Sequence, residues 1–411
     1  MLELIGTARL ITGEFWGVFE NPLFWVVLAL VALQYRRIAK TRESLFGIRG
    51  NSVVRDTLTA TLYGIVGGIF GSILLVFTGI NLMGLGINYI WPLALFLMLI
   101  NPRFLCFSYA GGIVALSSLI LGIPDVNVPQ LMGLIAILHL VESLLIYFSG
   151  HVGATPMFMK KPSGRMVGGF TLQKFWPLPI VAVAFLPEVS GFTLLPPMPE
   201  WWPVIRFEQG PALSMIGVII PFVAGLGYGD LALAHTPGEK SKISARNLSV
   251  FSLVLLLLSL LASRYRIIEW IAAIFTPLGH EIVILVGQNT EFKGKPIFVP
   301  PLRGVRVLEA VPNTAAEAAG LRSGDVVYAV NGIPVNSKRD IEGFIGVGPV
   351  FLEIEYIPYT KKKWHRAIVK LRPYQPLGII AVPEGEEAIY TEFNKQSLIS
   401  KLIDKFRGIR R

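Results

Sequence analysis

His280 and Glu281 stand side by side near the end of an apolar segment, and zinc proteases use this pair of residue types. Those enzymes carry the pattern H-E-x-x-H, in which two histidines one helical turn apart bind the metal and the glutamate is the general base. The second histidine would fall at position 284, which is Ile284. Because the ligand pair is incomplete, we predict that the chain is not an enzyme and that it uses no metal or other cofactor.

Other ionisable side chains also fall within apolar segments. His139 and Glu142 are three residues apart, which places them on one helix face. Asp230 completes the pattern G-x-G-D of aspartyl intramembrane proteases, but such enzymes need a second membrane aspartate to share a proton. The remaining aspartates lie in connections, at segment edges or in the C-terminal region, so the sequence shows no such pair.

Charged groups at membrane depth are costly and usually face one another or a cavity. We therefore predict an intramembrane polar cluster that holds helices together, formed by His139, Glu142, Asp230, His280 and Glu281. The alternative is a metal site or a proton path in which these residues, except Asp230, act as ligands or base. The incomplete ligand spacing argues against that alternative.

The segments around these residues belong to a membrane protein. The chain is 53% hydrophobic and only 16% charged, and the excess comes in blocks that end near residue 288. Each block approaches the ~20 residues that a helix needs to cross a bilayer. We predict a polytopic α-helical domain over residues 1–288, with about eight or nine spans. The candidates are 16–35, 56–79, 83–101, 103–122, 130–148, 174–188, 211–233, 247–263 and 267–287.

The span at 174–188 is short and contains three prolines, but the distribution of charge favours keeping it. The connections 36–55, 149–174 and 235–246 are basic, whereas 188–210 is acidic. Basic loops stay in the cytoplasm, so a crossing at 174–188 is needed to bring 235–246 back to that side. This arrangement predicts that the C-terminal region lies in the cytoplasm. The net charge of +10 is then attributed to basic residues that fix the orientation of the protein in the membrane. We expect no nucleic-acid partner.

After residue 300 the sequence pattern changes from long apolar blocks to one that predicts short strands, turns and helices. The decisive stretch is 311–345, "VPNTAAEAAGLRSGDVVYAVNGIPVNSKRDIEGFI", with small residues on a first helix, then G-L-x-x-G-D, then an N-G-x-P-V hairpin. It resembles a PDZ domain of the bacterial, circularly permuted type. We therefore predict a small α+β PDZ domain over 289–382. The remainder, 383–411, is predicted to be a linker followed by a basic amphipathic helix that contacts either the membrane or a protein surface.

The resemblance implies a peptide-binding groove in which a partner segment adds a strand beside a helix. The loop that captures a C-terminal carboxylate corresponds to Leu377, Gly378 and Ile379, although a loop at Gly304 is an alternative. The helix at 338–346 would line the groove through Ile341 and Phe344, or those two side chains would instead fill the domain core.

The order of a polytopic domain and one PDZ domain resembles the MinJ family of cell-division topological determinants. That resemblance implies a membrane scaffold of the bacterial plasma membrane that takes part in septum site selection, with DivIVA and MinD as protein partners. The competing prediction is an intramembrane metalloprotease-like protein or a regulator of a membrane protease, because PDZ domains are also fused to proteases. A transporter would need paired broken helices in two similar halves, and only 174–188 is irregular.

Overall fold

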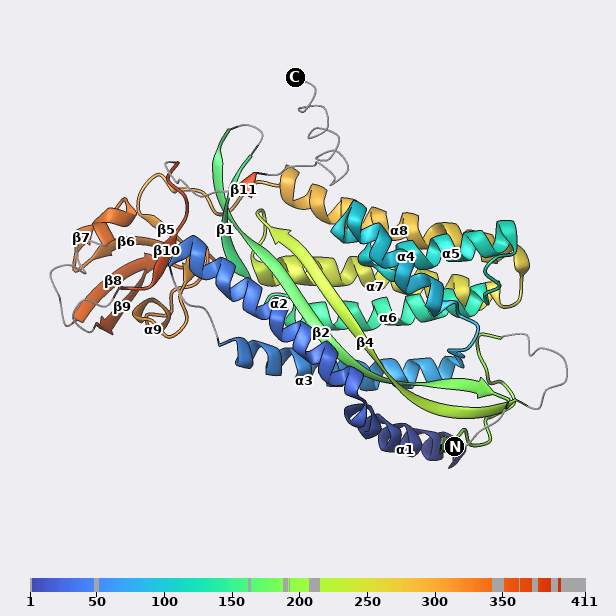
Figure 1. Cartoon of the computed structure of the whole chain (residues 1–411). Helices are drawn as coiled ribbons and strands as arrows, with labels where there is room; N and C mark the ends of the chain where they lie inside the picture. The colour runs from blue at the N-terminus through green and yellow to red at the C-terminus, as the bar shows by residue number, and fades with distance from the viewer. Residues whose placement is uncertain are drawn as a thin grey trace, which may run out of the picture.

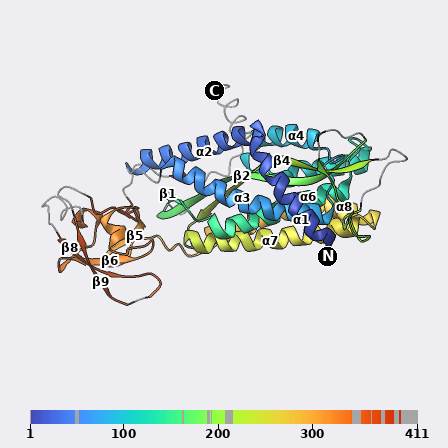
Figure 2. The ribbon, with the colours of Figure 1, turned by 90° about the horizontal axis from the view of Figure 1, so that it is seen from below.

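The computed structural model shows an elongated molecule in which long helices enclose a β-hairpin and a smaller strand-rich domain lies at one end (Figures 1 and 2). The structure describes residues 2–47, 52–161, 164–187, 191, 193–206, 215–341, 351–361, 363–371, 376–385 and 391–392. Phe344 and the predicted tail helix at 397–411 lie outside these residues.

The helical part confirms a domain with several membrane-spanning helices. Five helices of the described chain, α2, α3, α6, α7 and α8, are long and apolar enough to cross a bilayer, and α4 and α5 are shorter apolar helices. The bounds are α1 Leu2–Gly17, η1 Val18–Glu20, α2 Pro22–Phe46, α3 Val53–Thr78, α4 Ile87–Ile100, η2 Pro102–Leu105, α5 Phe107–Leu121, α6 Val128–Ser149, α7 Pro237–Ala262 and α8 Arg266–Lys293.

Two of the predicted helical spans are strands, so that part of the prediction was wrong. Residues 174–186 of the first segment lie in β2 (Met166–Leu186) and residues 216–232 of the second form β4 (Ile216–Ala232), and the two strands pair antiparallel from Phe170↔Ala232 to Leu186↔Ile216. Continuous apolar runs fit a buried strand as well as a buried helix, so hydropathy did not separate the two. The sheet has the order β11-β1-β2-β4-β3, with β1 Thr155–Lys160, β3 Thr193–Leu194 and β11 Thr391–Glu392.

The outer edge of β2 lies against α3 and α2, and side chains satisfy its backbone. The N–H of Val181 donates to Ser72 Oγ on α3 at 2.8 Å, and the N–H of Phe175 donates to the Tyr35 hydroxyl on α2 at 3.3 Å. A strand edge without such partners is not stable at membrane depth, because each orphaned donor costs several kcal/mol there. The side chains of α2 and α3 therefore make it possible to place a strand inside this helical domain.

Prolines remove the donors that these side chains do not reach. Pro177 and Pro179 alternate with Phe175 and Val181 on the same edge and carry no N–H. The carbonyl oxygens of Pro177 and Pro179 lie directly against Gly64 and Gly68 of α3, where any Cβ would collide with them. These prolines thus mark an edge strand rather than a broken helix.

The hairpin runs beside α3 over most of the length of that helix. Gly64 adjoins Pro177 near the middle of the helix, and Asn81, just after its end, forms a bridge with Val183. Figure 1 shows the two strands passing diagonally between the α2–α3 pair and helices α6, α7 and α8. The two segments therefore run alongside α3 as strands rather than as helices.

The C-terminal domain is a small α+β unit, as predicted. Asn331 and Gly332 adopt positive φ values of 50° and 74°, which is the hairpin turn that the N-G pair predicted. The strands follow the order β10-β5-β6-β8-β9, with β7 paired to β6. The bounds are β5 Val305–Ala310, α9 Ala315–Ala318, β6 Val326–Val330, β7 Ile333–Pro334, β8 Phe351–Ile357, β9 His365–Lys370 and β10 Ile379–Ala381.

This domain is docked on the helical part through one face of β5 and β10. Leu308, Ile380 and Val382 belong to the same buried cluster as Phe170 of β2, whereas Ala381 faces the core of the C-terminal domain itself. Alternate residues of β10 therefore serve two cores, as the period of a strand requires. The face of the sheet that a free domain of this kind would expose to water is covered here.

A buried ion pair lies at the docking interface. Arg42, in the last turns of α2, donates to Glu309 of β5 at 2.8 Å, and both side chains are largely buried. Burial raises the pKa of Glu309 to about 6 from its ordinary value of 4.5, and the charge of Arg42 limits the rise. A carboxyl group with a raised pKa binds its proton more tightly in the docked state. Docking is therefore weakened as pH rises from about 4.5 through about 6, and is independent of this group above that range.

We expect Arg42→Gln to weaken docking by about 3 kcal/mol at pH 8, because it leaves the Glu309 carboxylate buried without a countercharge. The effect should shrink at pH 5, where Glu309 is protonated, and Glu309→Gln should remove the pH dependence. Hydrogen–deuterium exchange of β5 at the two pH values measures this. An Arg42→Gln effect of equal size at pH 5 and pH 8 would show that the charge pair is not the cause.

Candidate functional site

The groove predicted in the C-terminal domain starts at the edge strand β10. Gly378 precedes it with φ of 84°, a conformation that favours glycine. The carbonyl of Gly378 accepts the N–H of Val311, and the carbonyl of Leu377 accepts the N–H of Ala316, both at 2.8 Å. Thr314 packs against the Gly378 α-carbon. These contacts fix the backbone at the point where the resemblance places the carboxylate-binding loop.

The outer edge of β10 has no partner strand within the described ranges, because β10 pairs with β5 alone. An unpaired edge beside a helix is what a peptide needs in order to add as a further strand. Ile379 is partly exposed, whereas Leu377 is buried in the domain core. Ile379 is thus the predicted groove residue that remains partly accessible to a ligand.

A second helical segment of this domain begins after Ser337. Ser337 and Asp340 cap each other, because the N–H of Asp340 donates to Ser337 Oγ and the N–H of Ser337 donates to the Asp340 carboxylate. Ile341 is 5% exposed and lies in the domain core, which was the second of the two roles considered for it. The N–H of Lys338 donates to Glu384 at 3.0 Å, which joins the start of this helix to the chain that follows β10.

The intramembrane residues that sequence reasoning grouped together have different partners in the structure. His139 of α6 and His280 of α8 are brought together, with ring centroids 5.2 Å apart. Glu142 follows His139 by one helical turn on α6. Glu281 instead accepts a hydrogen bond from the Tyr109 hydroxyl at 2.6 Å and pairs with Arg103 at 3.1 Å. The glutamate of the broken protease motif is therefore neutralised by a salt bridge.

A third group joins the two histidines. Cys106 Sγ lies 3.0 Å from His139 Nε2 and 3.6 Å from His280 Nε2, and Ser108 Oγ lies 3.2 Å from His139 Nε2. Ligand atoms of Cys106, His139 and His280 all lie within 4.8 Å of one another, which is the separation of groups that share one metal ion. Sequence reasoning missed Cys106, since it lies 33 residues from the nearer histidine.

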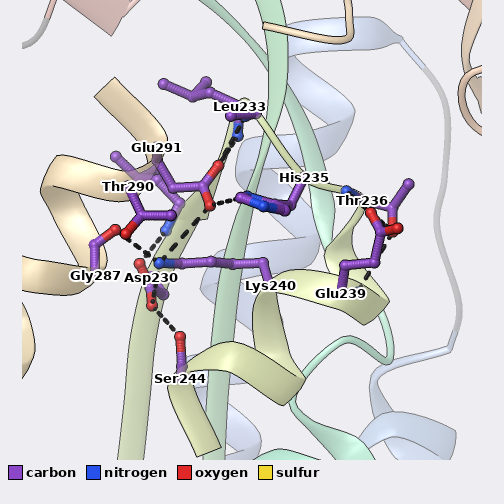
Figure 3. Close-up of polar contacts among 12 residues, drawn as sticks. Asp230, Leu233, His235, Thr236, Glu239, Lys240, Ser244, Gly287, Thr290 and Glu291 are labelled. Atoms are coloured by element: carbon purple, nitrogen blue, oxygen red, sulfur yellow. Dashed lines mark hydrogen bonds and ion pairs between the residues drawn. The ribbon is translucent and has the colours of Figure 1, made fainter. Parts of the chain in front are cut away.

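Asp230 belongs to a separate ionic network where β4 meets α7 and α8 (Figure 3). The ammonium group of Lys240, which is completely buried, lies 3.3 Å from Asp230 and 3.9 Å from Glu291, and donates to the carbonyl of Gly287 at 2.9 Å. Ser244 donates to Asp230 at 2.7 Å. The network connects the C-terminal end of β4 to α7 and α8. The sequence analysis predicts that this end of the hairpin lies on the cytoplasmic side.

Glu291 completes the network from α8. Its carboxylate accepts the N–H groups of Leu233 and Ala234 at 2.8 Å and lies 2.8 Å from His235 Nδ1. The sequence analysis placed Glu291 in the C-terminal domain and Lys240 in a basic connection. Neither residue was therefore predicted to belong to the intramembrane polar cluster. The signal that was available is the capping box of Thr236 and Glu239, which begins α7 before Lys240 and places that lysine in the first helical turn.

Comparisons with known proteins agree with this architecture. The family model described as the PDZ domain matches residues 306–346. Over 391 residues the chain is 25% identical to the cell division topological determinant MinJ of Bacillus subtilis (strain 168), covering 90% of this chain and 94% of MinJ. The chain is a polytopic membrane PDZ protein that resembles MinJ. The similarity extends through the helical domain as well as the PDZ domain. It therefore covers both domains and their order along the chain.

A second match is shorter. HhoA of a Synechocystis strain, which carries the name of a serine protease, is 41% identical over 58 residues. That stretch is 14% of this chain and 15% of HhoA. A match of this length concerns one module, and modules of this kind occur in proteins with unrelated activities.

Proposed function

We propose that the chain is a membrane-anchored PDZ adaptor that binds peptide segments of partner proteins at the cytoplasmic face of the bacterial plasma membrane and helps to place the cell-division machinery. The observation that carries the proposal is the edge of β10 that is unpaired among the described residues, within a membrane protein that resembles MinJ along most of its length. By this resemblance, the proposed partners are polar and division-site proteins such as DivIVA and MinD.

The cytoplasmic placement of the PDZ domain is supported by the position of the basic segments. Arg42, from the basic connection after the first span, contacts the PDZ domain directly through Glu309. Lys161 reaches the carbonyl of Phe292 at 3.4 Å, and Lys240 contacts α8 close to its C-terminal end. All three basic connections thus lie at the end of the molecule that carries the PDZ domain, which is the end that positive charge retains in the cytoplasm.

The groove supports peptide binding without any chemistry. A peptide strand on β10 gains main-chain hydrogen bonds, and a free carboxylate at its end would meet the loop at Gly378. Membrane anchoring raises the effective concentration of such a groove for partners on the same surface, so modest affinity is sufficient for an adaptor.

We expect Gly378→Ala to weaken peptide binding at least tenfold, which corresponds to about 1.4 kcal/mol. A Cβ at this position would collide with Thr314 and would strain the positive φ of 84°, so the loop must move. The measurement is fluorescence anisotropy of full-length protein in nanodiscs with labelled C-terminal peptides of DivIVA and MinD and a C-terminal peptide library. Each peptide is compared with its amidated form.

Gly332→Ala is the matched control. Gly332 has a similar φ of 74° but a Cβ there meets nothing within 4 Å, so this variant carries the backbone strain without the collision. It should bind peptides within about twofold of the unaltered chain. Absence of carboxylate-dependent binding by the unaltered protein would contradict the proposed groove, and equal losses in both variants would contradict the role of Gly378.

A further inference from the structure

The group formed by Cys106, His139 and His280 is independent of the PDZ groove and lies at the junction of three helices. Cys106 precedes α5 as its N-cap, His139 is in the middle of α6, and His280 is in α8. The whole sequence contains one cysteine and five histidines. The fold brings that cysteine and two of the histidines within 4.8 Å of one another, from positions up to 174 residues apart.

We propose that these three side chains bind a zinc ion that joins α5, α6 and α8. A thiolate with two imidazoles is a donor set suited to Zn²⁺, which prefers sulfur and nitrogen ligands in tetrahedral geometry. Three protein ligands leave a fourth position for water or another small ligand. On binding, the thiol of Cys106 loses its proton to solvent and the sulfur becomes a thiolate ligand.

The hydrogen bonds around His139 prepare it as a ligand. Its Nδ1 lies 2.8 Å from the carbonyl of Ile135, which can only accept, so Nδ1 carries the proton. The Nε2 atom then presents its lone pair to Cys106 and Ser108. A backbone carbonyl that holds the far nitrogen is the usual outer-sphere partner of a metal-binding histidine, because it fixes the tautomer and the ring.

His280 is held by rings rather than by hydrogen bonds. Its Nδ1 is buried and has no hydrogen-bond partner in the part of the chain that the structure describes. Phe251 and Tyr109 lie against the ring, with centroids 5.7 Å and 5.4 Å away. The packing fixes the imidazole with its Nε2 3.6 Å from Cys106 Sγ, so that this nitrogen is the one available to a shared ion.

Charge and access are compatible with a divalent ion. Zn²⁺ with one thiolate leaves a single positive charge, and Glu142, one helical turn after His139 on α6, is the acidic side chain that would balance it. Glu281, in contrast, is already paired with Arg103. Cys106 and His280 are partly exposed at the surface of the helical domain, whereas His139 is buried.

The test is the zinc content of the full-length chain, purified in detergent with a Strep affinity tag so that no tag histidines bind metal, and measured by inductively coupled plasma mass spectrometry. After incubation with ZnCl₂ and desalting, we expect about one zinc per chain. Cys106→Ser and His280→Ala should each raise the Kd for Zn²⁺ at least about 100-fold, because loss of even an outer-sphere partner costs 10–100-fold. His151→Ala removes an exposed histidine and should leave the zinc content unchanged.

A second measurement does not depend on how well the variants fold. Co²⁺ replaces Zn²⁺ in the unaltered protein and reports a sulfur ligand through its thiolate charge-transfer absorption, and X-ray absorption should give one Zn–S distance near about 2.3 Å. Zinc below about 0.1 per chain, zinc without a sulfur ligand, or zinc content equal in the unaltered chain and the Cys106→Ser variant would each overturn the proposal. Copper in place of zinc would overturn the assignment of the metal.

Discussion

Gly68→Ala is expected to prevent the helical domain from folding, although it adds one methyl group to a transmembrane helix. The added Cβ would overlap the carbonyl oxygen of Pro179 and come within 3.1 Å of its carbonyl carbon. Both partners are backbone, so neither side can turn away as a flexible side chain would. Overpacking that can relax costs about 1–3 kcal/mol, and here α3 and β2 must separate, so we expect a loss above about 3 kcal/mol.

The matched control is Gly13→Ala in α1. A Cβ at Gly13 meets nothing within 4 Å, and alanine favours a helix over glycine by up to about 1 kcal/mol. Thermal unfolding in detergent and the monodisperse fraction on gel filtration compare the two variants. Gly13→Ala should be as stable as the unaltered chain or slightly more so. If Gly68→Ala behaves in the same way, the contact between α3 and β2 is not as close as the structure shows.

Lys240→Met is expected to destabilise the chain by about 3–5 kcal/mol, the usual effect of removing one partner from a buried ion pair. Lys240 is completely buried, and its ammonium group faces Asp230, Glu291 and the Gly287 carbonyl (Figure 3). Methionine preserves most of the volume but removes the positive charge. Two carboxylates then remain close together in a poorly solvated place, held only by the other hydrogen bonds of the network.

Lys242→Met provides the control, because Lys242 lies on the same helix with its side chain exposed. Surface substitutions of this kind change stability by less than about 0.5 kcal/mol. Chemical unfolding in detergent, followed by tryptophan fluorescence, distinguishes the two variants. Equal stability of Lys240→Met and Lys242→Met would mean that the ammonium group does not compensate the two carboxylates.

The sequence by itself determined the division into a membrane domain and a PDZ domain. Apolar blocks long enough to cross a bilayer mark a membrane segment whatever its conformation, because exclusion from water depends on composition. The PDZ domain was recognisable because its turns and helix starts are local. Asn331 with Gly332 forms one turn, and Ser337 with Asp340 begins one helix, each within five residues. Such signals do not need the rest of the fold.

Only the tertiary structure decided that β2 (Met166–Leu186) and β4 (Ile216–Ala232) are strands. A buried strand and a buried helix have the same apolar composition, and what permits the strand is the side chains of other elements. Val181 depends on Ser72, 109 residues away, and Phe185 depends on Asn81, 104 residues away. Hydropathy gives no indication of such distant donors and acceptors, so 174–188 was predicted to be a helical span in spite of its three prolines.

The grouping of polar residues was likewise a property of the fold. Ionisable residues in apolar segments were singled out from the sequence as needing partners, because burial of an unpaired charge is costly. Sequence spacing relates residues on one helix, but Cys106, His139 and His280 come from three helices, and Lys240 and Glu291 from two. Which groups meet depends on how the helices pack around the hairpin, and that packing involves contacts over the whole chain rather than any local pattern.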